Sequence, residues 1–331
     1  MKALLATFAA GFTALLGMAS PATDAPAVIV VVGAPGEPEF GSNFVHQARL
    51  WEKLCDQAGA QVVRIGVEPT NTMSDHELLK QALAAGPTDG AEPLWLVLIG
   101  HGTFDGKDAR FNLRGPDVSN AELADWLQPF RRPLVVVDCS SASAPFLRSL
   151  SGTNRVVITA TRSGNELNFS RFGEQFAEAL GKPTSDLDKD GQVSLLEAFL
   201  MASRHVAEFY RTEGRLMTEH ALIDDNGDGL GTPADWFRGV QATRKAANGA
   251  SLDGARANQI CLVRSAEEQA LPAEVRARRD ALELSVARLR EDKSQMSETD
   301  YYNRLETVLL ELARLQEPSA TPSNPPIPSA K

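Results

Sequence analysis

The sequence has no excess of positive charge, which argues against one large class of partners. Its 331 residues include 43 Asp or Glu and 33 Lys or Arg, and the formal net charge is −10 at pH 7. Nucleic acids and anionic membranes bind proteins through clusters of Lys and Arg, and no such cluster is visible. We therefore expect no nucleic-acid partner, and no membrane partner for the mature protein.

Long apolar runs are scarce, and only the first stretch of the chain, MKALLATFAAGFTALLGMAS, holds one. Lys2 is followed there by Leu, Ala and Phe and then by small residues up to Ser20, a pattern typical of a secretory signal peptide. We expect residues 1–19 to be cleaved near Ala19, and the mature protein to be exported, either periplasmic or secreted. No other run is long enough to cross a bilayer.

Cysteine is also rare, with only Cys55, Cys139 and Cys261 in the whole sequence. Three is an odd number, so an exported chain would keep at least one thiol unpaired. Cys55 falls in an amphipathic stretch and Cys261 in a short apolar run. Either both are small buried apolar residues, or they form a disulfide and leave Cys139 free.

The first half of the chain alternates apolar runs of strand length with amphipathic stretches. Strands are expected in PAVIVVVGAPG, QVVRIGV, PLWLVLIGHG, RPLVVVDCSS and RVVITAT, with helices at 43–58, in SDHELLKQALAAG and in NAELADWLQPF. Alternation of this kind predicts an α/β fold in which a mainly parallel central sheet lies between helix layers.

The C-terminal part has a different pattern. Two apolar stripes separated by SETD predict a helical hairpin over residues 265–316, with Ser297 capping its second helix. The hairpin could pack on its own chain, act as an inhibitory cap, or allow self-association. Residues 317–331 are rich in Pro and Ser, so we expect a disordered tail.

Two chemically capable residues come directly after neighbouring strands. His101 follows PLWLVLIG and Cys139 follows PLVVVD. Parallel strands deliver their carboxyl ends to one crevice, where ligands bind, and an imidazole beside a thiol can activate it as a nucleophile. The placement of His101 and Cys139 after neighbouring strands predicts a Cys/His dyad. The plainer alternative is a buried thiol at a strand end and a histidine in a loop.

These residues resemble the legumain-like (haemoglobinase) cysteine peptidases of the caspase clan, in particular exported bacterial members with a helical C-terminal extension. The resemblance rests on IGHG, DCSSAS and NFVHQA and covers roughly residues 28–179. It implies the caspase–haemoglobinase fold, with a peptidase domain over 26–264 followed by the hairpin.

The resemblance also implies a role for each catalytic residue. Cys139 would attack the scissile carbonyl, and His101 would protonate the leaving amine. The backbone N–H groups of Gly102 and Cys139 would hold the oxyanion. Asn43 corresponds to the residue that orients the imidazole.

The sequence departs from the family at the specificity pocket. Where legumain-like enzymes have an Arg and an acidic residue, this chain has Val45 and Val137. A pocket lined by Val cannot pair with a carboxamide, so asparaginyl specificity is not expected. Asp138, Arg162 and Glu166 are polar candidates for a different pocket.

A calcium-binding pattern occurs between the predicted helices. DLDKDGQVSLLE has the spacing of an EF-hand loop, with Gly191 at the sharp turn and a helix after it. The expected oxygen ligands are Asp186, Asp188, Asp190, Gln192 through its main chain, Ser194 and Glu197. The alternative is a solvated acidic turn.

A second string, IDDNGDGLGTPAD, repeats part of this spacing with Asp224, Asn226 and Asp228. Counted from Asp224, Thr232 and Asp235 stand at the ninth and twelfth positions, and the shorter terminal carboxylate and the extra glycines weaken the match. We expect calcium in a structural role, and no organic cofactor.

The leading hypothesis is a cysteine endopeptidase, or a peptide-bond ligase, that acts on protein or peptide substrates through a thioester. The alternative is a catalytically inactive relative that serves as a calcium-binding scaffold. A serine hydrolase using Ser140 or Ser141 is disfavoured, because no G-x-S-x-G elbow surrounds either residue.

Overall fold

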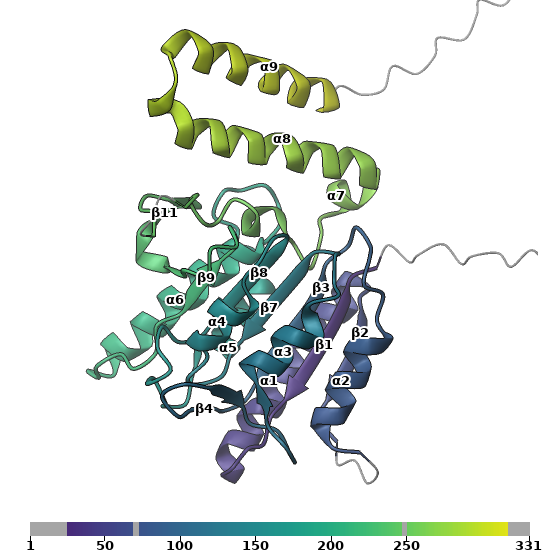
Figure 1. Ribbon diagram of the computed structural model, residues 1–331, viewed down its shortest axis with the longest axis vertical. Coiled ribbons are helices and arrows are strands. Elements are labelled where there is room, and N and C mark those ends of the chain that lie inside the picture. Colours follow the sequence, from purple (N-terminus) through teal and green to yellow (C-terminus); the bar gives the residue numbers. More distant parts are fainter. Residues whose placement is uncertain (1–24, 69–72, 247–249, 317–331) are drawn as a thin grey trace, which may run out of the picture.

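The chain folds around a central, mainly parallel β-sheet with helices on both faces, as Figure 1 shows. The computed structural model describes residues 25–68, 73–246 and 250–316. The predicted signal peptide, 1–19, and the predicted disordered tail, 317–331, lie outside the described residues. The predicted α/β fold with a mainly parallel sheet is confirmed.

Within the described residues the central sheet has seven strands in the order β2-β1-β3-β7-β8-β9-β10. The pairs from β2 to β8 are parallel, and β9 and β10 are antiparallel additions at one edge. The strands are β1 (Ala27–Val32), β2 (Gln61–Ile65), β3 (Leu94–Ile99), β7 (Leu134–Asp138), β8 (Arg155–Thr159), β9 (Leu222–Asp224) and β10 (Thr232–Pro233).

Both faces of the sheet are buried, because the central strands are apolar at consecutive positions. All six residues of β3 are buried, and alternate ones belong to separate clusters on the two faces. One face is covered by α1 (Pro38–Ala58), α5 (Phe172–Leu180) and α6 (Leu195–Thr212), and the other by α2 (Asp75–Ala85), α3 (Asn120–Leu127) and α4 (Ala144–Leu150).

The helix boundaries follow local signals in the sequence. Gly59 ends α1 in the left-handed conformation, with φ of +61°. The hydroxyl of Ser74 accepts the N–H of Glu77 at 3.2 Å and caps α2. The helix α1 begins earlier than the predicted 43, at Pro38, a residue suited to the first turn because it has no N–H to satisfy.

Several short elements were not predicted. A small antiparallel sheet follows His101 and consists of β4 (Gly102–Phe104), β5 (Ala109–Phe111) and β6 (Val118–Ser119). The others are β11 (Phe237–Arg238), β12 (Gln241–Ala242) and the 3₁₀ turns Pro183–Ser185, Ala234–Trp236, Ala257–Gln259 and Asp292–Gln295. Two or three residues are too few to show a hydrophobic period.

The predicted C-terminal helices are present as α8 (Ala273–Glu291) and α9 (Glu298–Gln316), preceded by the short α7 (Ala266–Ala270). They lie side by side, away from the sheet (Figure 1). The hydroxyl of Ser297 accepts the N–H of Asp300, as the predicted cap requires. Over the described residues, no helix combines the length and apolarity needed to cross a membrane.

Candidate active site

The fold brings His101 and Cys139 to the carboxyl ends of two neighbouring parallel strands. β3 and β7 pair with Leu98 opposite Asp138, and the N–H of Cys139 donates to the carbonyl of Leu98 at 2.9 Å. Cys139 belongs to the core cluster beneath α1 and α5. The ring of His101 lies 5.1 Å from that of Phe44 on α1. Both side chains therefore lie on the α1 face of the sheet.

His101 is held by aromatic rings and by one carbonyl. Its ring centroid lies 4.8 Å from that of Phe40 and 6.4 Å from that of Phe169, both with edge contacts. Its Nε2 lies 3.3 Å from the carbonyl oxygen of Pro35. Burial lowers the pKa of His101, against a smaller opposing effect of the Pro35 carbonyl. The imidazole is therefore neutral at pH 7.

The expected role of Asn43 is not seen. Both residues are in the described part of the chain, and Asn43 makes no hydrogen bond to His101, whose ring nitrogen lies instead beside the Pro35 carbonyl. Asn43 stands on α1 between Phe40 and Phe44, which contact the imidazole. Its helix contributes apolar packing to the histidine, and the loop before α1 contributes the hydrogen bond.

Cys139 is covered by α5. Only 4% of the residue is exposed, and a Cβ added to Gly173 would lie 2.9 Å from Sγ. Burial, and secondarily the negative charge of Asp138, raise the pKa of the Cys139 thiol well above its ordinary value. Among the described residues, its Sγ contacts only the Val137 carbonyl as a hydrogen-bond partner, at 4.0 Å, and not His101. The thiol is neutral in this conformation, whereas reactive cysteines have lowered pKa values.

The two N–H groups expected to hold the oxyanion are already engaged. The N–H of Gly102 donates to the hydroxyl of Ser141 at 3.1 Å, and that of Cys139 to the carbonyl of Leu98 at 2.9 Å. The absence of a side chain at Gly102 permits this contact, because a Cβ there would lie 2.2 Å from the Ser141 carbonyl oxygen. The predicted oxyanion hole is therefore closed in this conformation.

Two of the residues expected in the specificity pocket are core residues. Val137 is fully buried in β7, beneath α1. Asp138 is also fully buried and, because side chains alternate along a strand, it points to the opposite face from Val137. The N–H and hydroxyl of Ser140 donate to the Asp138 carboxylate at 3.0 and 2.6 Å. Burial raises the pKa of Asp138 to about 7. Neither residue can contact a substrate without leaving the core.

The other three expected pocket residues lie nearer the surface. Val45 is half-buried on α1. Arg162 and Glu166 form an ion pair at 3.5 Å, and Glu166 is shared with His220, whose Nδ1 lies 2.6 Å from its carboxylate. The carboxylate of Glu166 is thus neutralised within the protein rather than directed to a free pocket.

Two of the cavities among the described residues border the predicted sites. One of about 330 Å³ borders Asn43, Phe40 and Phe169, the last two of which also contact His101, and Arg171 and Arg215 are part of its wall. This cavity was not predicted, because its lining comes from three separate segments. A larger one, about 900 Å³, lies between α8 and the acidic loops, away from His101.

The predicted EF-hand loop forms a closed turn. The carboxylate of Asp186 accepts the N–H groups of Lys189 and Gly191 at 2.6 and 3.1 Å. Glu197 accepts the N–H groups of Leu187 and Asp188 at 2.5 and 3.2 Å with one oxygen, and the Ser194 hydroxyl at 2.9 Å with the other. Carboxylate oxygens of Asp186, Asp188 and Asp190 lie within 4.8 Å of one another. The donor set consists of oxygen atoms, as a hard cation prefers.

The second acidic string adopts the same pattern with one substitution. Asp224 accepts the N–H groups of Gly227 and Gly229 at 2.9 and 2.8 Å, at the fourth and sixth positions counted from Asp224 itself. The place that Glu197 holds in the first loop is taken by Asp253, which sequence reasoning missed. One oxygen of Asp253 accepts the N–H groups of Asp225 and Asn226 at 3.0 and 3.2 Å.

The other oxygen of Asp253 accepts the hydroxyl of Thr232 at 2.5 Å, as Glu197 accepts that of Ser194. Asp235, the expected twelfth residue of the string, is exposed. The loop is therefore closed by a carboxylate that lies outside the string.

No family model matches the chain, and none of the curated proteins is detectably similar to it. Among solved structures, the Drosophila initiator caspase Dronc is similar with a TM-score of 0.43 and 14% identity, covering 60% of this chain and 79% of that chain. Caspase-1 of Spodoptera frugiperda gives 0.37 and 11%, covering 60% and 86%. Protein GSU0716 of Geobacter sulfurreducens gives 0.38 and 12%, covering 55% and 89%. Likenesses this distant establish neither a family nor an activity.

Proposed function

We propose that the protein is an exported cysteine endopeptidase of the caspase-like type, held in a covered conformation. The observation that supports this proposal is the placement of His101 and Cys139 after two adjacent parallel strands, on the same face of the sheet and under the same helix. Carboxyl ends of parallel strands are where α/β proteins bind ligands.

The chemistry needs two proton transfers through one imidazole. Neutral His101 would take the proton from Cys139, and the thiolate would attack the carbonyl carbon of a peptide bond. The C–N bond would then break, with the imidazolium proton passing to the leaving amine and the acyl group remaining on sulfur as a thioester. Water would hydrolyse the thioester and regenerate the thiol. An amine in place of water would give ligation.

Two contacts must open before this chemistry can begin. The Ser141 hydroxyl must leave the N–H of Gly102, so that this donor can reach an oxyanion. Gly173 must move away from the sulfur of Cys139, which it covers. The peptide would then enter beside His101, from the cavity bordered by Phe40, Asn43 and Phe169.

A peptidyl acyloxymethyl ketone tests the proposal, because it alkylates a nucleophilic thiol: sulfur bonds to the methylene carbon of the probe and a carboxylate leaves. We expect mass spectrometry to find the label on Cys139 in the wild-type chain, and no label at this position in Cys139→Ala. Labelling should fall strongly in His101→Ala and persist in Cys55→Ala, which removes a buried thiol outside the site. Equal labelling of wild type and His101→Ala would refute the dyad.

The second candidate function, a catalytically inactive scaffold, is favoured by a different observation. Cys139 is buried, and both candidate oxyanion donors are engaged. A folded wild-type chain that resists labelling at every pH and calcium concentration would support this candidate. The partner would then be sought at the helical hairpin, through which self-association also remains a prediction.

We also propose that the two acidic loops bind calcium in a structural role. In the first loop three carboxylates lie close together. The second loop repeats the hydrogen-bond pattern of the first, with Asp253 in the place of Glu197. An exported protein meets calcium at concentrations that modest affinity can exploit. Each bound ion would stabilise the folded state relative to the unfolded chain.

A further inference from the structure

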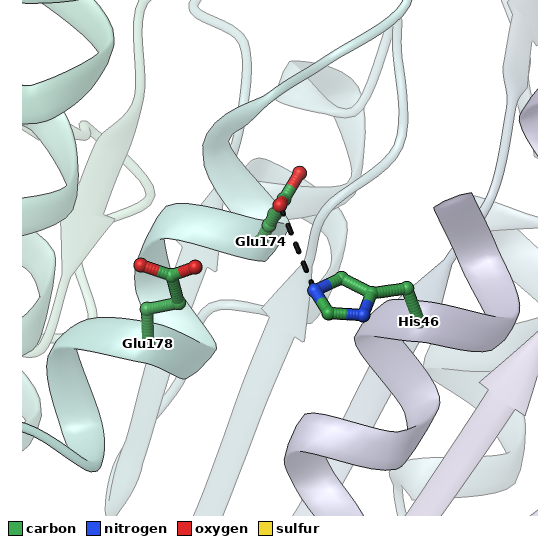
Figure 2. Close-up of side chains that lie close together, drawn as sticks. All are labelled: His46, Glu174 and Glu178. Carbon is green, nitrogen blue, oxygen red and sulfur yellow. Dashed lines mark ion pairs between the residues drawn. The ribbon is translucent and has the colours of Figure 1, made fainter.

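Three side chains outside the candidate active site converge at the contact between two helices. His46 comes from α1, and Glu174 and Glu178 come from α5 (Figure 2). The two glutamates are four residues apart, which places them on one side of their helix. The Nε2 of His46 lies 3.7 Å from a carboxylate oxygen of Glu174. One potential ligand atom from each of the three residues lies within 4.8 Å of the others.

The ligand chemistry differs from that of the acidic loops. One imidazole nitrogen and two carboxylate oxygens form a set that zinc and other divalent transition metals bind, whereas calcium prefers oxygen alone. Tetrahedral zinc with bonds of about 2.0–2.1 Å needs ligand atoms about 3.3–3.4 Å apart, so small rotations of these side chains suffice. The His46 side chain is 53% exposed, so solvent can deliver the ion and supply a fourth ligand.

Lys182 competes with a metal ion for Glu178, but it occupies only one of the two carboxylate oxygens. The ammonium group of Lys182 lies 2.5 Å from one oxygen of Glu178, so the second oxygen of that carboxylate remains for an ion. Glu174 makes its ion pair with His46 itself. A metal ion would replace that pair with two stronger bonds.

His46 and Glu174 are the chain neighbours of two residues that meet over Cys139. Gln47 follows His46, and Gly173 precedes Glu174. A Cβ at Gly173 would lie 2.6 Å from the Gln47 side-chain oxygen and 2.9 Å from the Cys139 sulfur. The Gln47 oxygen has no hydrogen-bond partner among the described residues, so this contact is held by packing alone.

We propose that His46, Glu174 and Glu178 bind a divalent transition metal ion, of which zinc is the best fit, and that the ion ties α1 to α5 over Cys139. The bound ion holds the Gly173 segment in place and slows the opening that exposes the thiol. Metal binding does not depend on the proposed peptidase activity.

The rival explanation is an ordinary surface ion pair, and the chain contains a matched example. The Nε2 of His76 lies 3.6 Å from a carboxylate oxygen of Glu122. Among the described residues, no third metal-ligating side chain joins that pair. His76→Ala therefore removes a comparable pair without touching the proposed site.

The test is a calorimetric titration of the full chain with zinc chloride, in excess calcium so that the acidic loops are filled. We expect one zinc site in the wild type and in His76→Ala, and affinity at least about ten-fold weaker in His46→Ala, Glu174→Gln and Glu178→Gln. Equal zinc affinity in wild type and His46→Ala would overturn the site.

A second measurement tests whether the bound ion holds α5 against α1 over Cys139, which we call the clamp. Zinc should slow the alkylation of Cys139 by iodoacetamide in the wild type and in His76→Ala, but not in His46→Ala. Protection that persists in His46→Ala would mean that zinc binds the thiol directly, and zinc binding without protection would mean that α5 is not held. Either result overturns the clamp. Failure of the peptidase probe to label Cys139 would affect neither measurement.

Discussion

Gly173 lies against Cys139 so closely that no side chain can stand between them. A Cβ at Gly173 would come within 2.6 Å of the Cys139 Cβ and 2.9 Å of its sulfur. Real Cβ atoms do not approach other atoms to these distances, so the helix α5 can cover the thiol only because this residue is a glycine. The packing of α5 over Cys139 therefore requires glycine at position 173.

Gly173→Ala should destabilise the protein. The added methyl group must push α5 away from β7, and overpacking of this kind costs about 1–3 kcal/mol. We expect a lower midpoint of urea unfolding and faster alkylation of Cys139. Gly181→Ala is the matched control at the C-cap of the same helix, since its Cβ would first meet Leu54 at 3.4 Å. Equal midpoints for the two variants would show that α5 does not press on the thiol.

The charge state of the dyad predicts the pH dependence of Cys139 reactivity. Burial raises the thiol pKa and lowers that of His101, so both groups are neutral at pH 7. A raised thiol pKa means that the thiolate fraction still grows above about pH 8.5, the ordinary value for cysteine. The rate of alkylation in the Cys55→Ala, Cys261→Ala chain should therefore rise through this range.

A thiolate–imidazolium pair would behave differently. It would give a plateau of reactivity from about pH 5 to 8, because the thiolate would already be formed there. Such a plateau would contradict the neutral pair. Because the imidazole pKa is lowered, any loss of rate from protonating His101 should appear only below about pH 6.5.

The arrangement of strands could be predicted because the sheet is buried on both faces. Consecutive apolar residues such as those of β3 mark such a strand in the sequence, and Gly59 and Ser74 mark helix boundaries. The short strands after His101 could not be predicted, because β4 to β6 are stabilised by tertiary packing and have too few residues to show a period.

The site was predictable only as far as strand ends determine it. The positions of His101 and Cys139 follow from the ends of β3 and β7. The use of Pro35 rather than Asn43 as the partner of the imidazole depends on a loop conformation that the sequence does not specify. Strand alternation could have shown that Asp138 and Val137 point to opposite faces. Asp253 carries no spacing signal, because it lies beyond the second acidic string.

Calcium binding to the second loop should require the carboxylate of Asp253 and not that of Asp235. Removal of calcium with a chelator should lower the melting temperature of the wild-type chain. Asp253→Asn should remove one of two calcium sites in a calorimetric titration and reduce the rise in melting temperature with calcium, because that carboxylate closes the second loop. Asp235→Asn should leave both unchanged, since its side chain is exposed.

The opposite result would restore the first interpretation of the string. If Asp235→Asn loses a site and Asp253→Asn retains it, the twelfth position supplies the ligand after a rearrangement of the loop. Glu197→Gln provides the parallel test for the first loop, where the corresponding carboxylate belongs to the string itself. An unchanged melting temperature in chelator would argue against a structural ion in either loop.

Glu92 should anchor the C-terminal helices to the sheet. It is buried just before β3 and receives two hydrogen bonds from Arg264, at 2.9 and 2.6 Å, while Arg276 of α8 lies 3.6 Å away. Glu92→Gln would leave two guanidinium groups without their counter-charge. We expect a loss of about 2–3 kcal/mol in the free energy of unfolding, less than for a fully buried pair because Arg264 is partly exposed.

Glu311→Gln is the matched control, because Glu311 pairs with Arg278 between α9 and α8 and both side chains are exposed. An exposed pair contributes at most about 1 kcal/mol, so this variant should unfold in urea nearly as the wild type does. A chain truncated after Ser265 loses Arg276 but retains Arg264, and should fall between the wild type and Glu92→Gln. If Glu92→Gln and Glu311→Gln are equally mild, Glu92 does not anchor the hairpin, and contacts such as Lys245 with Glu291 and Gln259 with Glu283 hold it instead.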